Sequence, residues 1–101
     1  MLKPLVILPE VFVELNEALD WYAERNPVLP GRFVAELRRT LQSVEQHPQQ
    51  GAYYDDEHCF RYRKLAKFPH LVIYRELNDR IEVLVVAHTS RRQGYWRDRV
   101  Q

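Results

Sequence analysis

The chain has 101 residues, of which 46% are hydrophobic and 29% are charged, and its formal net charge is +1 at pH 7. This length fits a single domain over residues 1–101, and the single cysteine, Cys59, excludes an intrachain disulfide and a cysteine-based metal site. The sequence carries neither a secretion-signal pattern nor an apolar run of membrane-spanning length. We therefore expect a cytoplasmic domain that uses no membrane, metal ion or cofactor.

The small net charge conceals a strong asymmetry along the chain. Residues 1–60 hold five Lys and Arg against ten Asp and Glu, a net charge of −5. Residues 61–101 hold ten against four, a net charge of +6, and they are also rich in aromatic side chains. A basic, aromatic half on a chain this small predicts an acidic partner, which is either a nucleic acid or an acidic polypeptide.

The first half of the chain predicts one short strand and a pair of helices. Residues 5–8 form an apolar run between two prolines, which suits a short strand. From Glu10 the apolar positions take helical spacing, and this helix ends at Asn26-Pro27 because the residue before a proline disfavours the helical conformation. A second helix follows a tight connection at residues 29–31 and ends at His47-Pro48. Two amphipathic helices joined by so short a loop predict an antiparallel hairpin that packs on a sheet.

The second half predicts a polar loop at residues 49–58, then strands and a tail. The expected strands span residues 60–65, 71–77 and 80–88, with a hairpin turn at Asn78-Asp79. Residues 83–87 are apolar at every position, which marks the central strand, covered on both faces. The charged residues 91–100 predict a turn followed by a frayed helix or an extended tail. The expected fold is therefore α+β, with an N-terminal strand, an α-helical hairpin, a three-stranded antiparallel meander that completes a small sheet, and a short C-terminal tail.

Five short signatures carry a resemblance to a known family. They are residues 18–22, residues 33–37, Pro48, Arg61 with Phe68-Pro69 and Tyr74, and residues 88–91 with Tyr95-Trp96 and Arg99. In this order and spacing the chain resembles the RelE/ParE toxins of bacterial type II toxin–antitoxin modules. The resemblance implies a cognate antitoxin, whose partly disordered acidic-hydrophobic segment folds on the toxin in a hetero-oligomer.

The resemblance implies one of two activities. RelE-like members cleave messenger RNA on the ribosome, and a nuclease of this kind would draw on Arg61, Lys64, Arg91 and Tyr95 as its catalytic residues. ParE-like members are associated with poisoning DNA gyrase by binding, without an acid–base set. Alignment on Tyr95 places Thr89 where RelE-like nucleases have a catalytic arginine, so the ParE-like branch, and hence a protein that is not an enzyme, is favoured. A third alternative is a non-toxic family member that only binds a partner.

The candidate docking residues fall into two groups. The basic face, expected to meet the antitoxin or the target, comprises Arg61, Arg63, Lys64, Lys67, Arg91 and Arg92, with Trp96 as a further candidate. No acidic partner for its strand residues is evident within the same segment. A second antitoxin groove is expected on the apolar flank of the helical hairpin, lined by Leu19, Trp21 and Phe33.

The histidines and the remaining aromatic residues have structural interpretations. His88 is either a proton carrier or, as we favour, a structural side chain that hydrogen-bonds the tail or a neighbouring backbone group. His70 is expected to pack among aromatic rings, Phe68 to bury its ring at a turn, and Tyr22 to belong to the core.

Overall fold

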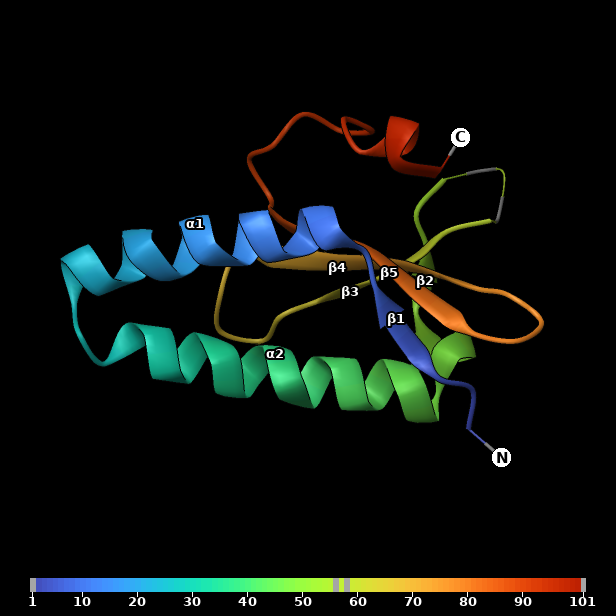
Figure 1. Cartoon of the computed structure of the whole chain (residues 1–101), viewed down its shortest axis with the longest axis horizontal. Coiled ribbons are helices and arrows are strands. Elements are labelled where there is room, and N and C mark those ends of the chain that lie inside the picture. The colour runs from blue at the N-terminus through green and yellow to red at the C-terminus, as the bar shows by residue number, and fades with distance from the viewer. Residues whose placement is uncertain (1, 56, 58, 101) are drawn as a thin grey trace.

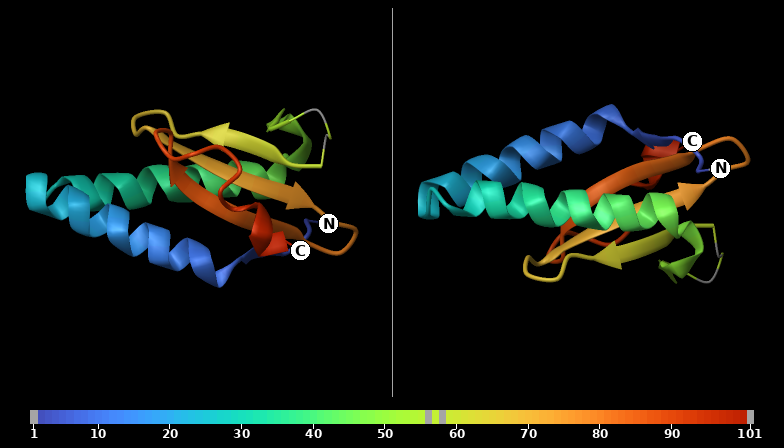
Figure 2. Two further views of the ribbon diagram at one scale, coloured as in Figure 1. Left: turned by 90° about the horizontal axis from the view of Figure 1, so that it is seen from above. Right: turned by 90° about the horizontal axis from the view of Figure 1, so that it is seen from below.

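A five-stranded sheet in the order β1-β5-β4-β3-β2 separates two helices from the C-terminal segment (Figure 1). The structure is a computed structural model, and it describes residues 2–55, 57 and 59–100. Helices α1 and α2 lie on one face of the sheet, and residues 91–100 cross the other face (Figure 2). In chain order the elements are β1 (Leu5–Ile7), α1 (Pro9–Arg25), α2 (Leu29–Gln46), the 3₁₀ turn η1 (Pro48–Gln50), β2 (Ala52–Tyr53), β3 (Arg61–Lys64), β4 (His70–Glu76), β5 (Ile81–His88) and the 3₁₀ turn η2 (Arg97–Val100).

The predicted α+β fold is confirmed, and strand pairing adds detail to it. Strands β3, β4 and β5 form the expected antiparallel meander, and β1 joins it by pairing in parallel with β5. Every residue from Ile81 to Ala87 is at most 8% exposed, so β5 is the central strand covered on both faces. The expectation of a loop at residues 49–58 is wrong for Ala52 and Tyr53, which pair with β3, and residues 56 and 58 of that range lie outside the described residues. A strand of two residues is too short to leave a periodic pattern in the sequence.

The helical hairpin is confirmed, but its connection is shorter than expected. Helix α2 begins at Leu29, so Pro30 and Gly31 belong to its first turn, where a proline is tolerated because its missing N–H would have no helical partner. The link therefore comprises only residues 26–28, with the Val28 amide donating to the Asn26 side-chain carbonyl at 3.0 Å. Neither long helix in the described part of the chain has the length and apolar character needed to cross a membrane.

The two faces of the sheet carry separate apolar clusters. On the helix face, Tyr22, Phe33 and Phe68 pack together with ring centroids 5.2–5.6 Å apart, which confirms that Tyr22 and Phe68 belong to the core. On the opposite face, Trp96 of the tail is 1% exposed and packs edge-on against Phe60 at 4.9 Å. The tail is thus part of the core, since its indole covers the sheet.

Candidate binding pocket and docking surface

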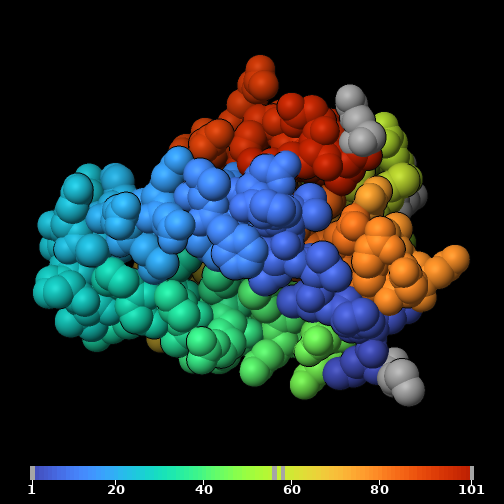
Figure 3. All heavy atoms as spheres, viewed as in Figure 1, coloured from blue at the N-terminus to red at the C-terminus, as the bar shows by residue number. Residues whose placement is uncertain are grey.

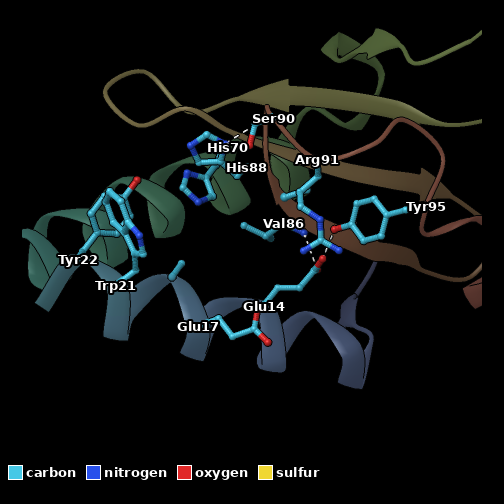
Figure 4. Close-up of a pocket in the computed structure, with 12 residues that line it drawn as sticks. Glu14, Glu17, Trp21, Tyr22, His70, Val86, His88, Ser90, Arg91 and Tyr95 are labelled. Atoms are coloured by element: carbon cyan, nitrogen blue, oxygen red, sulfur yellow. Dashed lines mark hydrogen bonds between the residues drawn. The ribbon is translucent and has the colours of Figure 1, made fainter. Parts of the chain in front are cut away.

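A pocket of about 360 Å³ opens between helix α1, the end of β5 and the tail; we call it the α1–tail pocket (Figure 4). The space-filling view shows the tail lying directly against the first turns of α1 (Figure 3). The pocket is lined by Glu14, Glu17, Ala18, Trp21, Tyr22, His70, Val86, Ala87, His88, Ser90, Arg91 and Tyr95. It is a concave, mostly apolar site with a few polar groups, which is the usual character of a binding pocket.

Glu14 of α1 ties the tail to the sheet at one end of this pocket. Its carboxylate accepts hydrogen bonds from the Tyr95 hydroxyl, from the Arg99 guanidinium at 3.1 Å and from the Val86 backbone N–H at 3.3 Å. Arg99 also donates to the Leu84 carbonyl at 2.9 Å, and the side chains of Glu14 and Arg99 are only 11% and 13% exposed. Charged groups this buried are retained where they are paired and hydrogen-bonded, so Glu14 fixes the tail on the sheet.

Tyr95 is a hydrogen-bond donor in this arrangement, and its hydroxyl is a weaker acid than usual. Burial of its ring, together with the hydrogen bond to Glu14 and the charge of that carboxylate, raises the pKa of Tyr95 well above its usual value. The Arg91 guanidinium lies over the Tyr95 ring, 4.3 Å from its centroid. The pocket therefore presents a cation held against a neutral phenol.

The opposite wall of the pocket is aromatic. Trp21 is 52% exposed and stands edge-on to Tyr22 with their ring centroids 5.2 Å apart, and the Arg25 guanidinium covers the indole at 3.3 Å. Large aromatic side chains that stay exposed beside a hollow are typical of protein–protein contacts.

Two histidines form the floor where β4 and β5 pair. His70 is 4% exposed and lies 4.9 Å from the Phe33 ring and 5.3 Å from the His88 ring, which confirms its packing role. Burial, and secondarily the charge that His88 can carry, lowers the pKa of His70 to about 4. His88 accepts hydrogen bonds at Nδ1 from the Ser90 backbone N–H at 3.0 Å, so its expected structural bond to a neighbouring backbone group is confirmed.

Arg61 and Arg63, which the sequence predicts to belong to the basic docking face, are both held by hydrogen bonds within the chain. Arg61 donates to the carbonyl oxygens of Gln49 and Gly51 at 3.0 and 2.8 Å, and Arg63 donates to the Ser43 hydroxyl at 2.9 Å. Arg63 also reaches the carbonyl of His47, the residue that caps α2. Helix α2 has no basic residue in its own last turn, so Arg63 supplies the positive charge that a helix C-terminus favours, and Arg61 holds the segment that follows it.

Four of the ten basic residues in the basic half form ion pairs within the chain. Arg75 forms an ion pair with Glu82, and Arg80 forms ion pairs with Asp79 and Glu82. Arg97 pairs with Asp55, and Arg99 pairs with Glu14. Within the basic half, four exposed cations have no carboxylate partner among the residues that the structure describes. They are Lys64, Lys67, Arg91 and Arg92. Their role in docking stays a prediction.

Among the four candidate nuclease residues, Arg61 lies apart from Arg91 and Tyr95. Arg61 contacts η1 and Gly51, whereas Arg91 and Tyr95 line the α1–tail pocket on the far side of β4 and β5. Lys64 is exposed and alternates with Arg63 along β3, so it points to the face of the sheet that the tail crosses.

The four apolar docking candidates have different positions. Phe33 is 0% exposed and Trp96 is 1% exposed, so the expectation that they offer surface to a partner is wrong: each fills one of the two cores. Leu19 is partly buried against the helix-face core, and Trp21 lines the pocket. Of these, Trp21 offers the largest surface.

Sequence reasoning missed Glu14 and Arg99 as a pair. Glu14 lies on a helix that carries several other exposed acids, and Arg99 lies in a charged tail, so no local pattern distinguishes them. In the described ranges, His, Cys, Asp and Glu side chains form no group of three that could hold a metal ion, and Cys59 is exposed.

The family follows from comparison with known proteins. Residues 5–93 match the family model described as the ParE toxin of type II toxin-antitoxin system, parDE. The chain belongs to this ParE toxin family. A chain in the structure described as the chromosomal ParDE TA system from P. aeruginosa has the same fold, with a TM-score of 0.75 and 18% identity over 85% of this chain and 95% of that chain. No curated protein matches the sequence.

Proposed function

We propose that this ParE-family protein arrests growth in the cytoplasm by binding DNA gyrase, and that a cognate antitoxin neutralises it by occupying the same surface. The family match over residues 5–93 carries the toxin role. The α1–tail pocket supplies a surface that suits a binding mode of action, with an exposed indole on one side and Arg91 on the other. An antitoxin segment that combines acidic and apolar residues complements both walls.

The geometry gives less support to the nuclease alternative. Ribosome-dependent RNA cleavage needs groups that activate the ribose hydroxyl and stabilise the phosphorane around one phosphate. Arg61 is engaged by backbone carbonyls elsewhere, and the Tyr95 phenol is held to Glu14 with its pKa raised. Arg91 is then the single member of the candidate set that is both exposed and at the pocket.

Expression of the protein alone, with parallel measurements of growth, DNA damage signalling and messenger RNA integrity, tests the proposal. We expect growth arrest with broken DNA and intact messages, together with inhibition of purified gyrase in a supercoiling assay. Intact DNA with cleaved messages would instead identify a ribosome-dependent nuclease. Unimpaired growth would indicate that the protein is not toxic and only binds a partner.

Co-expression with the product of the neighbouring reading frame tests the antitoxin. We expect growth to be restored and a stable hetero-oligomer to be recovered. The control is the Trp21→Ala, Arg91→Ala double variant, tested at a level of expression at which it is still toxic. If the partner restores growth equally well to cells that express this variant, the partner binds away from the α1–tail pocket.

A further inference from the structure

A second hollow, of about 220 Å³, runs along the outer side of helix α2, beside β1 at the edge of the sheet; we call it the α2 outer groove. In the right-hand view of Figure 2, α2 lies in front of the sheet with its outer side toward the solvent. Six of the residues that line the groove belong to α2, and Leu5 belongs to β1. The groove shares no lining residue with the α1–tail pocket, so it is a separate surface of the molecule.

The floor of the α2 outer groove is apolar. Leu5, Leu37 and Leu41 form it, and all three pack against or belong to the helix-face core. Val34 at one end of the groove is 36% exposed, and Val6 on the adjoining edge strand is 39% exposed. A partner that covers these side chains removes apolar surface from water, which favours association.

Two opposite charges stand on this face of α2, one on each side of Leu41. Arg38 and Glu45 both line the groove and are seven residues, or about 10 Å, apart along the helix axis, which is too far for them to pair with each other. No residue three or four positions from either of them carries a charge, so α2 offers neither a partner within the helix. Among the residues that the structure describes, neither Arg38 nor Glu45 forms an ion pair.

The positions of these two charges are self-complementary. A twofold axis perpendicular to α2, passing between Leu41 and Gln42, places a second α2 antiparallel to the first. Arg38 of each copy then lies opposite Glu45 of the other, because the two residues are equally far from the axis, about 5 Å on either side. Two ion pairs form across the axis, and the Leu41 side chains of both copies meet over the apolar floor.

The same charges give little attraction to other classes of partner. One cation and one anion leave the groove without net charge, whereas a nucleic acid or a strongly acidic peptide is drawn to a surplus of cations. An apolar face with one charge of each sign, placed symmetrically, instead suits a surface identical to itself.

We propose that the α2 outer groove binds a second copy of this chain, in a twofold dimer with two reciprocal ion pairs between Arg38 and Glu45. Because the face comprises one helix and one short edge strand, the dimer is weak and reversible. It depends neither on the toxin's target nor on its antitoxin.

Sedimentation velocity of the purified protein, at concentrations up to about 100 µM, tests the dimer. We expect a monomer–dimer equilibrium without larger species. Arg38→Glu and Glu45→Arg each turn both attractive pairs into repulsive ones, so each should weaken dimerisation by at least about tenfold. The matched control is Arg32→Glu, which reverses an exposed arginine of α2 outside the groove and should leave the equilibrium unchanged.

Recovery of the dimer from the two weakened variants gives the decisive comparison. In an equimolar mixture of Arg38→Glu and Glu45→Arg, a heterodimer contains one native and one exchanged ion pair, so it should form about as tightly as the wild-type dimer. The double variant Arg38→Glu, Glu45→Arg should likewise dimerise alone, and recovery in either case shows that the variant chains are folded. A wild-type protein that stays monomeric, an equal loss in Arg32→Glu, or no recovery in both the mixture and the double variant would overturn the proposal. These outcomes do not depend on whether the protein arrests growth or binds gyrase.

Discussion

Glu14 on helix α1 and Arg99 in the tail form a buried ion pair with their side-chain atoms 3.1 Å apart, although 85 residues separate them in the sequence. The Tyr95 hydroxyl and the Val86 amide donate to the same carboxylate. Replacement by Gln keeps an acceptor of similar shape and leaves Arg99 without its counter-charge. We expect Glu14→Gln to lower the free energy of unfolding by about 2–3 kcal/mol in urea denaturation. Glu17 lies on the same wall of the pocket but is exposed, so Glu17→Gln should change the free energy of unfolding by less than about 0.5 kcal/mol. If both variants lower the free energy of unfolding equally, Glu14 does not fix the tail on the sheet.

His70 makes stability depend on pH. Its pKa is lowered to about 4 in the folded protein, so the unfolded chain binds a proton more readily between pH 6.5 and pH 4. Stability contributed by the neutral ring is therefore complete above about pH 6.5 and is lost as the pH falls toward 4, by about 3 kcal/mol in total. Unfolding free energies measured across this range should fall accordingly. The His70→Phe variant should lack this component of the pH dependence, and an unchanged profile in that variant would assign the effect to other groups.

Two glycines give a matched pair of substitutions with opposite outcomes. A Cβ at Gly51 would lie 2.2 Å from the Tyr74 hydroxyl, which donates to the Pro48 carbonyl at 2.6 Å and cannot move without losing that bond. We expect Gly51→Ala to destabilise the protein by about 1–3 kcal/mol. A Cβ at Gly31, in the first turn of α2, meets no atom within 4 Å, so Gly31→Ala should be neutral or stabilising by up to about 1 kcal/mol. Thermal unfolding of the two variants side by side checks the pair.

The arginines of the basic half should divide into structural and docking residues. Arg61→Ala removes three hydrogen bonds, to Gln49, Gly51 and Tyr53, and should cost about 1–2 kcal/mol of stability. Arg91→Ala combined with Arg92→Ala removes exposed cations and should change stability by less than about 0.5 kcal/mol. The same double variant should lose most of its toxicity if the α1–tail pocket meets the target. Growth curves and denaturation, measured on Arg61→Ala and on the double variant, separate the effect on toxicity from the effect on stability. If the double variant folds and is fully toxic, Arg91 and Arg92 do not contact the target.

The sequence predicted what depends on local periodicity. The helical spacing from Val11 to Tyr22, the unbroken apolar run in β5 and the turn at Asn78-Asp79 each reflect a preference of neighbouring residues, and the elements appear where they were expected. The start of α2 differs from the expected boundary by a residue or two, because a proline in the first turn of a helix resembles a loop residue in the sequence.

The site was less accessible to prediction because its contacts are distant in the sequence. Arg61 and Arg63 appeared free since no acid lies near them in the chain. Their partners include the backbone carbonyls of Gly51 and His47, which follow α2 and which no sequence pattern marks. Trp96 could not be placed because a single aromatic residue in a charged tail is compatible with an exposed or a buried position. Its burial follows from the tail crossing the sheet, a property of the tertiary structure alone.

The parallel pairing of β1 with β5 determines the order in which parts of this protein can fold during synthesis. Leu5 finds its partner at Ile81, so the first strand of the chain has no neighbour in the sheet until four-fifths of the residues have been synthesised. Contacts with so large a separation form late and slow the folding of a small domain. A growing chain on the ribosome therefore displays its amphipathic hairpin before the sheet beneath it exists. Any partner that recognises only the finished surface must wait for the chain to be complete, whereas one that captures the hairpin alone can act on the nascent protein.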